Sequence, residues 1–120
     1  MLKEPIFRIL SVSQEDNIVN AVLEIDELNE IFNGHFPNQP VVPGACMLQM
    51  VKEVLAGALK VALRLVKADN IKFLSLIQPS SQSLQLNIAY QLTDNDIKVN
   101  ASLSFGEISF MKLQGTFVIL

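Results

Sequence analysis

The sequence predicts an α+β domain in which antiparallel strands accompany one long, mostly buried helix. Apolar residues cover most of the circumference of the segment from Gly44 to Lys60, as expected for a helix buried over most of its perimeter. Segments on both sides of it alternate apolar and polar residues, as strands with one buried face do. Segregation of one helix from antiparallel strands is typical of the α+β class. The 120 residues amount to a single domain, 1–120.

Two strands are expected before the helix, over residues 5–12 and 18–25, with a turn at 14–17. Residues 26–32 fit one or two short helical turns, for which Asp26 is a suitable N-cap. The apolar face of the second strand consists of Val19, Ala21, Leu23 and Ile25.

Four strands are expected after the helix, in the order of a meander. The expected ranges are 61–78, 84–93, 97–105 and 107–119. The first should be interrupted or bulged near Ala68–Asn70. A turn at 93–96 should join the second and third as a hairpin. In the last strand the apolar parity changes at Phe110–Met111, which indicates a β-bulge.

Composition indicates a chain that associates with another chain. Half of the residues are apolar and the mean hydropathy is +0.36, which is high for a soluble monomer of this size. Because one helix covers one face of a curled sheet, dimerisation through the sheet is the expected way to cover the rest. The net charge of −3 disfavours a nucleic-acid-binding protein.

No membrane span, disulfide, metal or cofactor is expected. Ile31 to Val51 carries no formal charge, but its three prolines would leave backbone groups unsatisfied in lipid. The start of the chain, MLKEPIF, lacks the pattern of a signal peptide. Cys46 is the only cysteine, and one histidine with one cysteine is too few for a structural zinc site. We therefore expect a soluble cytoplasmic protein.

The residues that could carry chemistry are concentrated at the start of the long helix. His35 is the only histidine, and the stretch from 33 to 43 is stiffened by prolines at 37, 40 and 43. A helix N-terminus presents unpaired N–H groups and partial positive charge, and Gly44 lets a ligand approach closely. The pattern suggests proton abstraction next to a carbonyl, with His35 as base and the Gly44 N–H as oxyanion donor.

Plainer interpretations of the same residues remain open. A histidine beside a phenylalanine is often a packed, hydrogen-bonded side chain, and Gly44 could simply be a turn residue. Gln49 and Glu53 lie one turn apart on the same helix face. With Ala45, Lys52, Ala56 and Lys60 they form a narrow stripe that also fits a solvated face.

One motif adds specific information. GHFPNQPVVPG at 34–44 resembles the signature of the 3-hydroxyacyl-(acyl-carrier-protein) dehydratases of fatty acid synthesis, which is close to GHFPxxPxxPGxxxxE. NIKF at 70–73 also resembles a later strand of that family. The matching positions are Gly34, His35, Phe36, Pro37, Pro40, Pro43 and Gly44.

The resemblance implies a hotdog fold, in which a curled antiparallel sheet wraps one central helix. It implies a dimer or trimer of dimers with sites at the dimer interface, where the acyl-phosphopantetheine chain enters a tunnel between subunits. His35 would be the catalytic histidine, and the Gly44 N–H would hold the thioester carbonyl. The expected substrate-binding residues are Phe36, Pro43, Ala45 and Phe73.

The chain departs from the family pattern at the catalytic acid. The family places Glu or Asp fourteen residues after the histidine, where this chain has Gln49. An amide cannot donate a proton in that way. Either Glu53, one turn later, serves as the acid in a (3R)-3-hydroxyacyl-carrier-protein dehydratase, or dehydration has been lost. The second case predicts a subunit that binds acyl-carrier protein or partners an active dehydratase in a hetero-oligomer, or else a hotdog thioesterase.

The distribution of charge is compatible with an acidic partner. The segment 52–72 holds five cations against two carboxylates, whereas residues 1–30 hold seven carboxylates against two cations. A locally basic surface could steer an acidic acyl-carrier protein, or an acyl-CoA thioester, toward the site. The same pattern is also explained by separate, solvated surface charges that have no role in binding. The cations of the segment are Lys52, Lys60, Arg64, Lys67 and Lys72.

Overall fold

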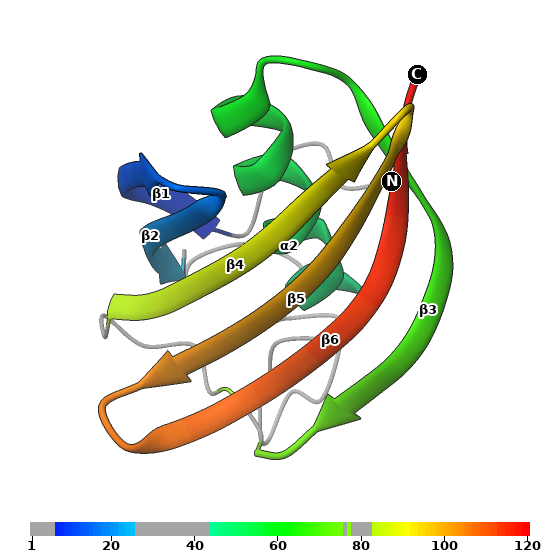
Figure 1. The fold of residues 1–120 in the computed structure, drawn as a ribbon. Coiled ribbons are helices and arrows are strands. Elements are labelled where there is room, and N and C mark those ends of the chain that lie inside the picture. The colour runs from blue at the N-terminus through cyan, green and yellow to red at the C-terminus, as the bar shows by residue number, and fades with distance from the viewer. Residues whose placement is uncertain (1–6, 26–43, 76, 78–82) are drawn as a thin grey trace.

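The computed structural model describes residues 7–25, 44–75, 77 and 83–120, which form a six-stranded antiparallel sheet with one helix against it (Figure 1). The elements are β1 (Phe7–Glu15), β2 (Ile18–Ile25), α2 (Gly44–Leu59), β3 (Leu63–Phe73), β4 (Ser83–Thr93), β5 (Asp96–Phe105) and β6 (Ile108–Ile119). The expected short helix at 26–32 and the proline-rich stretch at 33–43 lie outside the described residues.

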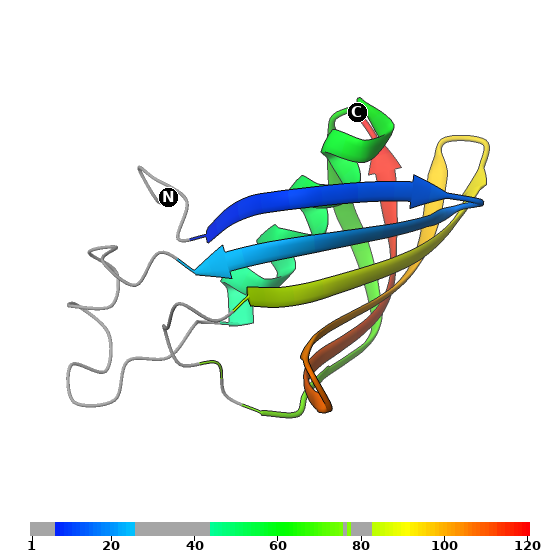
Figure 2. The same ribbon diagram turned by 90° about the vertical axis from the view of Figure 1, so that its left-hand side faces the viewer.

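The sheet curves around the helix and remains open. Its strand order is β1-β2-β4-β5-β6-β3, so that β1 and β3 form its edges. In Figure 1 β4 and β5 cross in front of α2 and the sheet continues to the right through β6 and β3, and Figure 2 shows β2 and β1 continuing the sheet beyond β4. This arrangement confirms the predicted α+β class and the curled sheet around one helix that the hotdog fold requires.

The predicted meander is wrong for its first strand. The two-residue turns between β4, β5 and β6 make these three strands neighbours, as expected. β3, however, pairs with β6, and β4 pairs with β2. Residues 74–82 separate β3 from β4. A connection of that length does not impose the neighbour pairing that a tight hairpin turn imposes.

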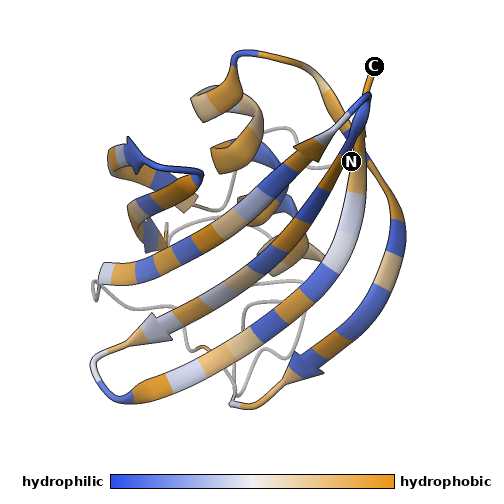
Figure 3. Ribbon diagram, in the orientation of Figure 1, coloured by the Kyte–Doolittle hydropathy of each residue, from blue (hydrophilic) through white to orange (hydrophobic). Residues whose placement is uncertain are grey.

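The core lies between α2 and the concave face of the sheet. Strand residues alternate between buried apolar and exposed polar positions, and Figure 3 shows this alternation clearly along β4 and β5. No polar or charged residue of the described segments is buried. The helix contributes six buried residues to this core: Cys46, Met47, Met50, Val51, Val54 and Leu55.

Bulges interrupt three strands. Register shifts in β3 leave Val66 and Asp69 as extra residues, which confirms the interruption expected near Ala68–Asn70. A shift in β6 leaves Phe110 as an extra residue, so that Phe110 and Met111 are both buried, which confirms the second predicted bulge. β1 is also bulged, at Leu10, which the sequence did not indicate.

The bulged part of β3 lies unusually close to β6. A side-chain carbon on Gly115 would be 2.6 Å from the backbone carbonyl oxygen of Lys67. Only glycine therefore permits this approach of the two backbones at the bulge.

The turn after β1 and the end of α2 both use left-handed backbone conformations. Asp16 and Asn17 have φ values of 49° and 65°, which fit the type I′ turn of a two-residue hairpin loop. Lys60 has a φ of 59°, and the Val61 N–H donates to the Ala56 carbonyl over 3.2 Å. That bond is the Schellman arrangement that ends many helices. Within the described segments, no helix has the length and apolar character needed to cross a membrane.

Candidate active site at the start of the helix

The helix begins at the predicted residue, Gly44. Its first N–H groups have no partner within the helix, and the aligned peptide dipoles add partial positive charge at this end. No acidic side chain lies in the first turn of α2 to neutralise that charge. The start of α2 is therefore suited to stabilise an oxygen that gains negative charge.

Phe73 packs directly against Gly44. A side-chain carbon built on Gly44 would be 2.8 Å from Cζ and 3.1 Å from Cε1 of Phe73. The backbone of Gly44 is not in the left-handed region. Glycine is therefore required here for space, because the aromatic ring occupies the position of a Cβ.

The end of β3 holds Phe73 in this place. Phe73 lies opposite Met111 of β6, on the concave face of the sheet, and the Leu74 N–H donates to the Phe110 carbonyl over 2.8 Å. The residue is nevertheless 53% exposed. It thus forms an accessible apolar wall beside the start of the helix, and its role in binding substrate stays a prediction.

The helix face with Gln49 and Glu53 is uncovered in the single chain. Four residues at successive spacings of four are exposed along α2: Ala45, Gln49, Glu53 and Gly57. Gln49 and Glu53 are about 6 Å apart along the axis. Lys52 and Ala56, which were expected in the same stripe, are half-buried. The helix is thus buried on the sheet side and open on the other.

The structure brings together part of the predicted site. Phe73 packs on Gly44 at the start of α2, and Ala45, Gln49 and Glu53 follow on the exposed face of the helix. The predicted residues His35, Phe36 and Pro43 lie outside the described residues. The approach of His35 to Gly44 therefore stays a prediction.

Other candidate groups do not add to this site. Cys46 is buried, and burial raises the pKa of its thiol, which disfavours the reactive thiolate. The basic segment 52–72 divides between α2 and the outer face of β3. Among the described residues, no three histidine, cysteine or carboxylate side chains are grouped to hold a metal ion.

The family of the chain follows from a comparison of its sequence. The model of the ApeI-like family, described as ApeI dehydratase, matches residues 11–109. The chain belongs to the ApeI-like dehydratase family. This confirms the resemblance found in the motif at 34–44.

Individual relatives are more distant. The 3-hydroxyacyl-(acyl-carrier-protein) dehydratase FabZ of Fusobacterium nucleatum is 25% identical, over 93% of this chain and 83% of that protein. FabZ of Streptococcus suis is 30% identical, over 62% of this chain and 57% of that protein. The chain thus spans little more than half the length of this second relative.

A solved structure supports the fold. One chain of the dehydratase heterocomplex ApeI:P from Xenorhabdus doucetiae superimposes with a TM-score of 0.75 at 20% identity. The match covers 92% of this chain and 96% of that chain. The fold of the ApeI-like chain described here is therefore the hotdog fold.

Proposed function

We propose that this ApeI-like chain removes water from a (3R)-3-hydroxyacyl thioester of acyl-carrier protein, or of CoA, to give the trans-2-enoyl thioester. Fatty acid synthesis or a related polyketide-type lipid pathway would use this step. The observation that carries the proposal is the close packing of Phe73 on Gly44 at the N-terminus of a helix whose first turn holds no acidic side chain. This arrangement combines an apolar wall for an acyl chain with donors for a thioester oxygen.

The proposed mechanism uses His35 as the base. Its imidazole takes the proton from C2, and the electrons of that bond form the C2–C3 double bond while the C3–O bond breaks. The thioester oxygen gains negative charge during this step, and the Gly44 N–H with the helix dipole stabilises it. The hydroxyl leaves C3 with a proton from a general acid and departs as water.

The general acid of this chain would differ in position from that of the family. Gln49 occupies the family's acid position but cannot supply a proton. Glu53 can, and it shares the exposed face of α2 with Gln49. The two residues are about 6 Å apart along the helix. Because catalysis is sensitive to displacements of about 1 Å, use of Glu53 requires a pocket of different shape from that of the family.

A second candidate function is a partner subunit without dehydratase activity of its own. Gln49 favours it, since a helix face with an amide at the acid position can bind a thioester without protonating the leaving group. The exposed face of α2, formed by Ala45, Gln49, Glu53 and Gly57, would then contact a second hotdog subunit that carries the acid. The similar chain from Xenorhabdus doucetiae is itself part of a dehydratase heterocomplex. A homodimer or trimer of dimers is the corresponding arrangement for the active enzyme.

One assay separates these two candidates. The purified chain alone is tested for hydration of enoyl thioesters of several chain lengths on acyl-carrier protein and on CoA. Activity that His35→Ala abolishes, while Glu15→Gln at the end of β1, away from the start of α2 (Figure 2), leaves it intact, supports the dehydratase. Absence of activity until a second hotdog subunit is added supports the partner subunit. Hydrolysis of the thioester without hydration overturns both.

A further inference from the structure

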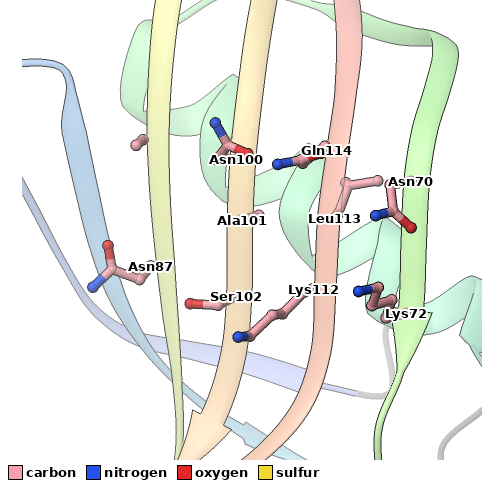
Figure 4. A pocket seen from close by; sticks show the side chains of 10 residues that line it. Asn70, Lys72, Asn87, Asn100, Ala101, Ser102, Lys112, Leu113 and Gln114 are labelled. Carbon is pink, nitrogen blue, oxygen red and sulfur yellow. The ribbon is translucent and has the colours of Figure 1, made fainter.

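A hollow of about 300 Å³ lies on the outer face of the sheet, on the side away from α2 (Figure 4). It is separate from the site at the start of the helix. Seven of its ten lining residues are polar, and none of them is a carboxylate. The lining residues are Asn70, Lys72, Asn87, Ala89, Asn100, Ala101, Ser102, Lys112, Leu113 and Gln114.

The strand register arranges these side chains in two rows. In the first row Lys72 lies opposite Lys112, and Lys112 lies opposite Ser102. In the second row Asn70 lies opposite Gln114, which lies opposite Asn100. Figure 4 shows Lys112 extending from β6 toward Ser102 and Lys72 pointing from β3 toward β6. A cationic row therefore runs beside an amide row.

The opposed lysines are unfavourable without a counter-charge. Like charges directly opposite on neighbouring strands destabilise a sheet. Among the described residues, Lys72 and Lys112 form no ion pair, whereas Lys67 on the same strand pairs with Asp69 over 3.2 Å. The chain as a whole is acidic, with twelve carboxylates against nine cations. The uncompensated pair thus marks a place where an external anion would lower the electrostatic energy.

We propose that the hollow binds a small phosphomonoester with a hydroxyl-bearing remainder, such as a sugar phosphate. A phosphomonoester carries about −1.5 to −2 charges at neutral pH, which matches two ammonium groups, whereas a carboxylate supplies one. Its three acceptor oxygens suit the amino groups of Lys72 and Lys112 and the Ser102 hydroxyl. The amides of Asn100 and Gln114 both donate and accept, so they suit the hydroxyls of the remainder.

The test is calorimetric titration of the whole chain with glucose 6-phosphate, inorganic phosphate and glucose. Glucose 6-phosphate should bind more tightly than either fragment, because only it occupies both rows. Lys72→Gln and Lys112→Gln should each weaken binding by about tenfold or more, since each removes hydrogen bonds to a charged group. Lys98→Gln is the matched control. Lys98 is exposed on β5 and is not among the residues that line the hollow.

Thermal unfolding provides an independent test of the proposed binding site. In phosphate-free buffer, Lys112→Gln should unfold at a higher temperature than the wild type, because it removes the like-charge pair. Glucose 6-phosphate should raise the unfolding temperature of the wild type by more than that of Lys112→Gln at the same concentration.

Three outcomes would overturn the proposal: no binding of glucose 6-phosphate, equal losses in Lys98→Gln and Lys112→Gln, or binding only to phosphatidylglycerol vesicles. Equal losses would indicate a general charge effect. Vesicle binding alone would assign the surface to lipid.

Discussion

The ring of Phe73 lies where the side chain of residue 44 would begin, with 2.8 Å between Cζ and a Cβ built on Gly44. Residues 29 positions apart in the sequence are therefore matched in size at the start of the helix. The wall beside the proposed oxyanion site depends on this match.

The match predicts energetic coupling between the two positions. Gly44→Ala should lower the free energy of unfolding, because the new methyl group meets the ring. In a Phe73→Ala background the same change should be neutral or stabilising, because alanine favours helix. We expect a coupling of about 1 kcal/mol from a double-mutant cycle measured by urea denaturation. Strict additivity of the two changes would show that the ring and the helix start do not interact.

The placing of an amide at Gln49 and a carboxylate at Glu53 on α2 predicts opposite effects of two variants. If Glu53 is the general acid, Glu53→Gln should lower enoyl thioester hydration by about a hundredfold or more. Gln49→Glu restores the family's residue at its usual place and should keep or raise the rate. Glu15→Gln, which removes an exposed carboxylate at the end of β1, is the matched control. Full activity of Glu53→Gln would exclude Glu53 as the acid.

The left-handed conformation of Lys60 predicts a stabilising substitution. A side chain in this conformation costs about 1 kcal/mol, which glycine avoids. Lys60→Gly should therefore raise the unfolding temperature by about 4 °C. Lys60→Ala removes the charge but keeps the Cβ, and it should show no such gain. Equal gains in both variants would assign the effect to charge.

The buried thiol of Cys46 predicts a loss of stability at alkaline pH. Burial raises its pKa in the folded state above the ordinary value of 9.0, so the folded state holds this proton more tightly than the unfolded state. The stabilisation is complete below about pH 9 and is lost as pH rises toward the folded pKa. Lysines and tyrosine titrate in the same range, so the measurement is the difference in unfolding free energy between wild type and Cys46→Ala. A difference that stays constant from pH 7 to about pH 11 would contradict the prediction.

Local patterns in the sequence predict most elements of the fold and the pairing of β4, β5 and β6, but not the pairing of β3. The alternation in β2, β4 and β5 and the apolar helix identify the strands and the start of α2. The bulges at Asp69 and Phe110 follow from breaks in these patterns. The pairing of β3 with β6 does not, because it depends on how the chain returns across the sheet after residues 74–82.

The candidate site could also be predicted only in part from local patterns in the sequence. The sequence places Gly44 at the helix start because proline and glycine there have direct backbone consequences. The packing of Phe73 on Gly44 is a tertiary contact that no local pattern reports. The sequence also does not predict that Lys72 lies opposite Lys112. Two extra residues in β3, Val66 and Asp69, change the register that sets this pairing.

The two bulges of β3 also restrict what this edge of the sheet can join. A straight edge strand exposes a regular row of backbone groups to which any extended peptide can add. Here the extra residues Val66 and Asp69 break that row and change the strand's course. A regular strand therefore cannot add along the whole edge, whereas a strand with matching irregularities can. The edge is in this way protected against indiscriminate aggregation and remains open to a complementary chain.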